Sequence, residues 1–349
     1  MPGSSKTAVN ITAAEGAPAS IVCSDLTAQT FASGLGKKQG GTGGLLQLLN
    51  PMAGGSGTQG ILLFKDFSSF IARRPEVRGE LMSQLREIYD GSYDPKKGVK
   101  VPAWSGKVTI IAAATPAIER AWAVQRELGE RFVQVRWSRQ DGVAMARAAG
   151  RQVGHHKQIG QELRRLSKDL IEGAMKIKAE RPEPEEFAWL AEMTARLRAH
   201  VVRDNDAKRT IIDVPEPEAP TRLTMVMAQI ARGHAALFGR KQPAKADVDA
   251  AKRIAYDTVP SNRYRVFRNI PDKGGVNRGE LIRASGLPES SIIWITDELK
   301  ALGVLAEISE IEVRYAFTEE FQKLKNDAMN GTEWTPIVDD QGEQPGLLN

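Results

Sequence analysis

Short runs of consecutive apolar residues recur through the first 140 residues, and amphipathic stretches separate them. Such runs, bounded by polar or glycine-rich sequence, are typical of strands that are covered on both faces. The stretches between them have helical spacing, most clearly Val77, Leu81, Leu85 and Ile88. Alternating strands and helices predict a parallel α/β sheet. The predicted strands are Ser20–Ser24, Gly60–Phe64, Lys107–Ala114 and Phe132–Trp137, and the predicted helices are 6–15, Val77–Tyr89 and Ile118–Leu128.

The pattern changes after residue 140, where highly charged helical sequence continues to about residue 207. A proline-rich linker at 215–220 precedes two further predicted helices, Thr221–Phe238 and Lys245–Val259. Residues 261–325 predict a helix–turn–helix followed by two short strands. Trp189 and Trp294 fit apolar stripes and are expected in the core. We therefore predict domains at 1–140, 141–260 and 261–325, and a disordered acidic tail at 326–349.

The net charge of +5 on this chain of 349 residues is unevenly distributed. Residues 261–325 hold ten basic and ten acidic residues, and residues 326–349 hold five acids and no base. The positive excess therefore lies in residues 1–260, where electrostatic contact with DNA is expected. No apolar run is long enough to span a membrane, no apolar leader follows Met1, and the single cysteine, Cys23, fits a reducing compartment. We expect a cytoplasmic protein that does not bind membranes.

The first candidate for chemistry is the segment Gly3-Ser4-Ser5-Lys6-Thr7, directly before the first predicted helix. In a P-loop, G-x-x-x-x-G-K-[ST], backbone N–H groups surround the phosphates, the lysine reaches the β- and γ-phosphate oxygens, and the hydroxyl binds Mg²⁺. Lys6 and Thr7 match the last two positions. Ser5 stands where the second glycine belongs, and the first glycine would precede Met1. Taken alone, the segment is also typical of an unstructured N-terminus.

A second candidate is Asp66, which follows the apolar run Ile61–Phe64. Four apolar residues leading to an acid are typical of a Walker B strand, whose carboxylate holds Mg²⁺ through water. Two positions depart from that pattern. Lys65 stands where the motif usually has an apolar residue, and Phe67 stands where a catalytic glutamate normally lies. Without that base, turnover should fall and the protein would be a nucleotide-binding switch. The candidates to replace the glutamate are Asp90, Ser68 and Glu119.

Three further polar residues stand at the ends of predicted elements. Thr115 follows the strand Lys107–Ala114, where a polar side chain can contact the γ-phosphate or orient the attacking water. Arg131 lies just before Phe132, where it can reach the nucleotide of a neighbouring subunit. Arg222 opens the helix that begins at Thr221.

In this order and spacing, the motifs resemble those of the AAA+ ATPases, and most closely the branch that includes minichromosome-maintenance helicases and magnesium chelatases. The resemblance covers about residues 3–259 and is most specific at 221–254. It implies a three-layer α/β/α fold with an all-α lid, ATP and Mg²⁺ as cofactors, and a homo-oligomeric ring. The strand that the family places before the P-loop is missing, so we expect an N-terminally truncated product. The implied roles are Walker A for Lys6 and Thr7, Walker B for Asp66, sensor 1 for Thr115, arginine finger for Arg131 and sensor 2 for Arg222.

Residues 261–325 resemble a winged helix of the bacterial transcription-regulator kind, with Pro288–Gly303 as the DNA-reading helix. The expected phosphate contacts on DNA are Arg263, Arg265 and Arg268, directly before it. The reading helix itself carries more acids than bases: Glu289, Asp297 and Glu298 against Lys300. A packing or protein-contact module is therefore the alternative to a DNA reader.

The sequence as a whole predicts an ATP-binding AAA+ ATPase that acts as an oligomer on DNA. It is also similar to ATPases of phages and mobile elements that carry K-D-F after the Walker B strand, here Lys65-Asp66-Phe67. The alternatives are a DNA-binding regulator or helicase-loading factor with little turnover, and an interaction scaffold if no nucleotide binds. The Lys/Arg-rich helices between 147 and 209 are either solvated surfaces or the lining of a DNA channel.

Overall fold

The computed structural model describes residues 6–17, 19–24, 26–27, 30–31, 44–52, 58–94, 103–120, 131–136, 141–204, 209–309 and 312–329. The chain divides into two compact units. The first comprises Met1–Phe132, Arg139–Lys178 and Ala236–Gly239. The second comprises Val133–Ser138, Ala179–Ala235 and Arg240–Asn349. Neither predicted boundary, at residue 140 or at residue 260, separates these units.

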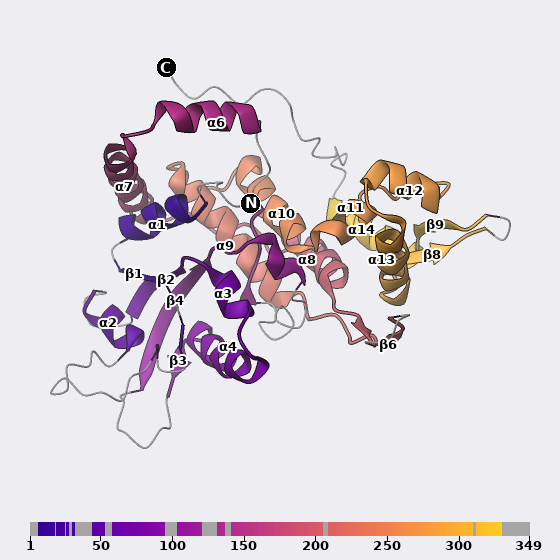
Figure 1. Ribbon diagram of the computed structural model, residues 1–349, viewed down its shortest axis with the longest axis horizontal. Helices are drawn as coiled ribbons and strands as arrows, with labels where there is room; N and C mark the ends of the chain where they lie inside the picture. The colour runs from indigo at the N-terminus through magenta and orange to yellow at the C-terminus, as the bar shows by residue number, and fades with distance from the viewer. Residues whose placement is uncertain are drawn as a thin grey trace. The chain divides into compact units, whose positions relative to one another are not determined.

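A mixed sheet forms the centre of the first unit (Figure 1). Strands β1 (Ser20–Cys23), β2 (Thr58–Phe64) and β4 (Trp104–Ala112) are parallel, and the short β3 (Ser92–Tyr93) pairs antiparallel with the start of β4. The spatial order is β1-β2-β4-β3. In the register, Cys23 lies beside Phe64 and Phe64 beside Ala112. The predicted mixed α/β class and three of the four predicted strands are therefore confirmed.

Helices pack against this sheet through the apolar stripes that the sequence shows. The helices are α1 (Lys6–Gly16), α2 (Leu45–Met52), α3 (Phe67–Ile71) and α4 (Pro75–Tyr89). Helix α4 buries Leu81, Leu85 and Ile88 against strand residues such as Leu62. This stripe is the predicted one, except that Val77 lies at the exposed end of the helix.

The predicted strand Phe132–Trp137 is wrong over its described part, since residues 133–136 form no sheet ladder in the described chain. The N–H of Gln134 donates to Thr258 Oγ1 at 3.0 Å, and the N–H of Arg136 donates to Asp257 Oδ2 at 2.9 Å. Side chains at a helix end thus take the place of a neighbouring strand. The predicted helix Ile118–Leu128 begins within a 3₁₀ turn, Pro116–Arg120, and its later part lies outside the described residues.

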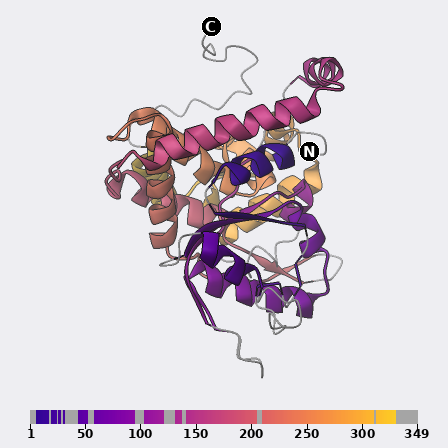
Figure 2. The same cartoon turned by 90° about the vertical axis from the view of Figure 1, so that its left-hand side faces the viewer.

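Two charged helices, α6 (Gly142–Arg151) and α7 (His156–Met175), complete the first unit. Figure 2 shows α7 as the long magenta helix lying alongside the indigo α1. An ion pair joins Arg164 to Glu15. The helices approach closely at Gly16, where an added Cβ would lie 2.9 Å from the backbone of α7. Helix α6 buries none of its residues, so this segment presents a solvated surface.

One hydrophobic core runs through the second unit. It contains residues from α8 (Glu185–Arg198), α9 (Thr221–Leu237), α10 (Lys245–Thr258) and α11 (Ser261–Phe267), together with every element that follows them. The two-stranded sheet β5 (Val202–Arg203) and β6 (Ile211–Asp213) belongs to the same unit. Helices α10 and α11, on either side of the predicted boundary at residue 260, thus share one core.

The end of the second unit follows the predicted helix–turn–helix and hairpin. Helices α12 (Arg278–Ser285) and α13 (Glu289–Ala301) precede β8 (Leu305–Glu307) and β9 (Arg314–Phe317), and β7 (Val276–Asn277) completes a sheet of order β7-β9-β8. Asn277 and Glu280 form a capping box that begins α12. The helix ends at Gly286, whose φ of 65° favours glycine.

The predicted disordered tail is wrong at its beginning, because helix α14 (Glu319–Met329) continues through residues 326–329. Its buried Phe321 packs against Phe267 and Phe317, with ring centroids 6.2 and 5.8 Å apart. Helix α14 lies against α8. Residues 330–349 lie outside the described chain. None of the helices in the described ranges combines the length and the apolar character needed to cross a membrane.

Both tryptophans expected in the core are instead exposed. Trp189 on α8 keeps 49% of its surface exposed, and Trp294 on α13 keeps 41%. Each lies beside a helical stripe whose other members are buried, including Leu190 on α8 and Ile295 on α13. Both tryptophans therefore lie on the outer sides of their helices.

Candidate functional site

Asp66 lies at the carboxyl end of β2 and begins helix α3. Its backbone is extended (φ −142°, ψ 100°), and its Oδ1 accepts a hydrogen bond from the N–H of Ser68 at 2.9 Å. This is the geometry of an N-cap, which satisfies a helix N–H that has no partner in the helix. The side chain is exposed, so a carboxylate is available to solvent at the edge of the sheet.

Thr115 follows β4 and meets the same serine. The N–H of Thr115 donates to Ser68 Oγ at 3.0 Å, and the hydroxyls of the two residues are also 3.0 Å apart. Parallel neighbouring strands end at the same edge of a sheet, which brings the residues after β2 and β4 together. Ser68 therefore links Asp66 to Thr115, and the two candidate residues belong to one site.

Phe67, which occupies the position of the expected catalytic glutamate, points into the core. Phe67 is 1% exposed, and its ring lies 4.6 Å from Phe70 and 6.3 Å from Phe132, centroid to centroid. Its N–H donates to the carbonyl of Ala113 at 2.7 Å, which fixes α3 against β4. A carboxylate at residue 67 would thus be buried. Of the three replacements suggested by the sequence, Ser68 contacts both Asp66 and Thr115.

Arg131 forms an ion pair within its own unit. Its Nη2 lies 2.7 Å from Asp90 Oδ2, its Nε donates to Asp90 Oδ1 at 3.3 Å, and its guanidinium carbon lies 6.0 Å from the Tyr89 ring centroid. The side chain is 16% exposed. Asp90, one of the three candidates to replace the catalytic glutamate, thus has Arg131 as its ion-pair partner.

The structure describes the remaining predicted nucleotide-binding residues to different extents. Lys6 and Thr7 begin α1, but their side chains and residues Gly3, Ser4 and Ser5 lie outside the described residues. Arg222 is the second residue of α9 and is half-buried in the second unit. Within the described ranges, no group of three His, Cys, Asp or Glu side chains is arranged to hold a metal.

The prediction that Arg263 contacts DNA is wrong, because Arg263 is 3% exposed. Its Nη1 donates to the carbonyls of Leu197 (2.8 Å) and Ala199 (2.7 Å), and its Nη2 pairs with Glu298 Oε2 at 2.8 Å. Burial lowers the pKa of this guanidinium, and the charge of Glu298 opposes that effect.

The other two predicted phosphate contacts are also constrained. The guanidinium of Arg265 donates to the carbonyl of Ser285. Arg268 is half-buried and caps the end of α11. The three arginines thus do not form one exposed basic surface. Periodicity alone could not separate them, because the groups that bury Arg263 lie on α8 and α13.

Comparison with known proteins gives no independent support for a family. No protein-family model matches the chain, and no curated protein is similar to it.

Proposed function

We propose that this protein is an ATPase of the AAA+ type that acts as an oligomer on DNA. The observation that carries the proposal is the link from Asp66 through Ser68 to Thr115 at the carboxyl edge of β2 and β4. Ligand sites in parallel α/β sheets lie outside the carboxyl ends of the strands. An acid and a hydroxyl from neighbouring strands are the groups that a Mg²⁺–nucleotide site needs there.

The described residues fit part of such a site. Asp66 is exposed, and only its Oδ1 takes part in the cap of α3, which leaves the carboxylate charge for a hydrated cation. Thr115 is exposed beside it and can orient a phosphate or a water. By the sequence match, Lys6 and Thr7 would hold the phosphates and the ion. Bound Mg²⁺ would neutralise charge on the phosphates.

A second candidate, a nucleotide-binding regulator or loading factor with little turnover, is favoured by Phe67. The buried ring occupies the position where a base would stand. Ser68 can orient water through its hydroxyl, but a neutral hydroxyl is a poor general base. Slow turnover is therefore the expectation even if the site binds ATP.

The proposed DNA contact rests on the second unit. Helices α12 and α13, followed by the β8–β9 hairpin, have the order of a winged helix, and Figure 1 shows this hairpin projecting beyond α13. The acidic residues of α13 would repel DNA phosphates, so the proposed DNA contact is not made by the centre of that helix. A protein partner on this module is the alternative.

ATP binding and hydrolysis, measured with and without duplex DNA, test the proposal with Asp66→Asn. Asparagine is as good an N-cap as aspartate, so α3 keeps its cap while the charge for Mg²⁺ is lost. The matched control is Asp141→Asn, because Asp141 caps α6 with the same bond, Oδ1 to the N–H of Val143 at 2.8 Å. We expect Asp66→Asn to abolish Mg²⁺-dependent turnover and Asp141→Asn to leave it unchanged.

Three outcomes separate the candidates. Turnover that Lys6→Ala and Asp66→Asn both remove supports the ATPase. Tight ATP binding without turnover in the wild type supports the regulator. A wild-type protein that neither binds ATP nor differs from Lys6→Ala overturns both and leaves the interaction scaffold.

A further inference from the structure

Trp294 is an exposed aromatic residue on the helix that a winged helix would present to DNA. The buried stripe of α13 consists of Ile292, Ile295 and Leu299, and Trp294 lies outside it with 41% of its surface exposed. Two arginines contact this part of α13: Arg203 of β5, and Arg209, which lies between β5 and β6.

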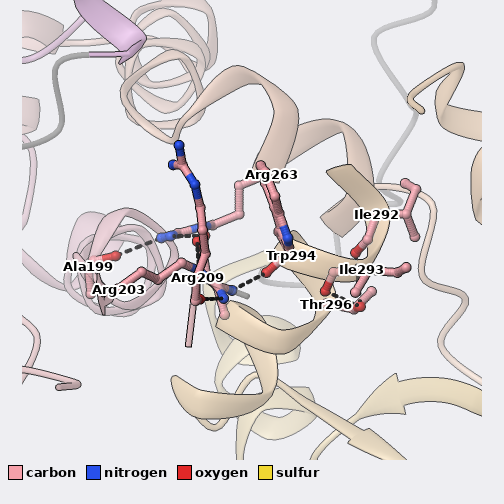
Figure 3. A network of polar contacts seen from close by, with 9 residues as sticks. Ala199, Arg203, Arg209, Arg263, Ile292, Ile293, Trp294 and Thr296 are labelled. Carbon is pink, nitrogen blue, oxygen red and sulfur yellow. Dashed lines mark hydrogen bonds and ion pairs between the residues drawn. The ribbon is translucent and has the colours of Figure 1, made fainter. Parts of the chain in front are cut away.

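Arg203 of β5 fixes the β5–β6 sheet to α13 (Figure 3). Its Nη2 donates to the carbonyl of Trp294 at 2.9 Å, and its Nε donates to Glu298 Oε1 at 3.1 Å. The third donor, Nη1, reaches the carbonyl of Arg209 at 2.8 Å. One planar guanidinium thus holds the helix and the segment leading into β6 at fixed positions.

Arg209 is held in an unusual conformation by these contacts. Its φ is 49°, a left-handed backbone conformation that is strained for a residue with a Cβ. Its guanidinium carbon lies 5.4 Å from the centroid of the Trp294 ring. Strain of this kind persists where surrounding contacts impose it, and it is frequent at functional sites. The exposed arginine is therefore preorganised on the surface of α13.

Two other bases near α13 already have acidic partners. Lys300 pairs with Asp297 at 3.1 Å and with Glu307 at 2.6 Å, and Arg278 pairs with Glu289 at 3.4 Å. For Arg209, the described chain supplies the Trp294 ring but no acidic partner. A guanidinium that stacks through its face keeps its N–H edge for a planar, bidentate acceptor such as phosphate.

We infer that Arg209 is a phosphate-binding residue through which the second unit contacts duplex DNA, with Arg203 and Trp294 as its positioning residues. This inference rests on the proposed action on DNA. It moves the phosphate contact from the buried Arg263 to the exposed Arg209, between β5 and β6. DNA would then be held at the flank of α13 rather than along its acidic surface.

Binding of the full-length protein to a short labelled duplex, titrated over a range of salt concentrations, tests this assignment with Arg209→Gln. Loss of one phosphate contact lowers the slope of log K against log salt by about 0.9 and weakens binding about fivefold at 0.15 M salt. The matched control is Lys323→Gln, which removes one exposed positive charge from α14 in the same unit. We expect that variant to match the wild type.

Two further variants distinguish a residue that contacts phosphate from residues that only position it. Arg209→Lys keeps the charge, so the salt slope should be retained while affinity falls because the fork is lost. Trp294→Leu should weaken binding with the slope unchanged, because the arginine remains but is no longer held. If the wild type binds DNA and Arg209→Gln binds equally well, this inference is overturned and the proposed function stands. If the wild type does not bind duplex DNA, the proposed action on DNA fails as well.

Discussion

Glu298 on α13 neutralises the buried guanidinium of Arg263 on α11, with Oε2 and Nη2 2.8 Å apart. The same carboxylate accepts from Arg203 Nε through its other oxygen, at 3.1 Å. One side chain therefore joins α11, α13 and the β5–β6 sheet. Because Arg263 is 3% exposed, its charge has no access to water that could replace this partner.

Glu298→Gln should destabilise the second unit strongly. The substitution keeps the shape of the side chain but leaves the buried Arg263 without a counter-charge, and removing one partner of a buried pair costs about 3 kcal/mol or more. Urea titration of the full chain, with hydrogen exchange of peptides from α11 and α13, would report the loss in this unit.

The control for this prediction is Glu289→Gln on the same helix. Glu289 pairs with Arg278 at 3.4 Å, and both side chains are exposed. Exposed pairs contribute less than about 1 kcal/mol, so this variant should unfold near the wild-type midpoint. Equal effects of the two substitutions would show that the burial of Arg263 does not carry the energy assigned to it.

The sequence predicted local structure well where one helix or strand decides the outcome. Three of the four positions in the stripe expected on α4 are buried, namely Leu81, Leu85 and Ile88. Predictions were wrong where groups far away in the sequence determine whether a side chain is buried. Arg263 donates to carbonyls 64 and 66 residues away, and no local sequence pattern predicts these contacts. The contact between Trp294 and Arg209, which lies between β5 and β6, likewise joins residues far apart in the sequence.

The candidate site was partly predictable for a topological reason. Asp66 and Thr115 each follow an apolar run, and parallel pairing of those runs brings their ends together. The role of Ser68 as the link could not be ranked above Asp90 or Glu119 from sequence, because it depends on the geometry of α3. The strand expected at Phe132–Trp137 failed because a strand requires a neighbour, and residues 134 and 136 bond to α10 instead.

Introducing the missing glutamate at residue 67 should not create an active base. Phe67 is buried among Phe64, Phe70 and Phe132, so Phe67→Glu would both remove an aromatic ring and bury a carboxylate. Truncating a buried phenylalanine alone costs about 3–5 kcal/mol, and an unpaired charge adds to that cost. We expect loss of the folded first unit, measured by urea titration, and no gain of ATP turnover.

Two matched variants make this prediction specific. Phe67→Leu keeps an apolar side chain and should cost about 1 kcal/mol. Ser69→Glu places a carboxylate at an exposed position in the first turn of α3, where an acid is tolerated. A stable Phe67→Glu protein with raised turnover would instead show that α3 can turn this residue toward the nucleotide.

The buried Asp247 on α10 should make the second unit sensitive to acid. Hydrogen bonds from Arg240, and then from His234 and the N–H of Ala244, hold the pKa of Asp247 well below its usual range. His234 Nδ1 lies 2.6 Å and the N–H of Ala244 2.7 Å from the carboxylate. A depressed carboxyl pKa stabilises the folded state above the unfolded value of about 4, and that stabilisation is lost as pH falls through the folded value.

Asp247→Asn should therefore cost about 2 kcal/mol at neutral pH, the scale of a hydrogen bond to a charged group. The difference from the wild type should begin to shrink as the pH falls below about 4, because the unfolded wild-type chain then binds a proton at Asp247 that the folded carboxylate excludes until its own, lower pKa is reached. Urea titrations at several pH values would measure both effects. Asp249→Asn, at an exposed position on the same helix, is the control and should leave the stability and its pH dependence unchanged. A constant difference at all pH values would contradict the assignment.

Arg131 provides the sharpest test of assembly. If it acts on the nucleotide of a neighbouring subunit, Arg131→Ala should lower ATP turnover about 10³-fold with little change in ATP binding. Asp90→Asn is the matched control, because it breaks the same 2.7 Å ion pair while keeping the arginine. Turnover should survive in that variant, which excludes a loss caused by the broken pair alone.

Mixing two inactive variants then decides whether the arginine acts across an interface. An Arg131→Ala subunit keeps Asp66, and an Asp66→Asn subunit keeps Arg131, so an interface formed by one of each contains both groups. We expect the mixture to recover turnover that neither variant has alone, with a dependence on the mixing ratio that peaks near equal amounts. A mixture that stays inactive, although both variants bind ATP and assemble, would place Arg131 in its own subunit's site or in the Asp90 ion pair alone.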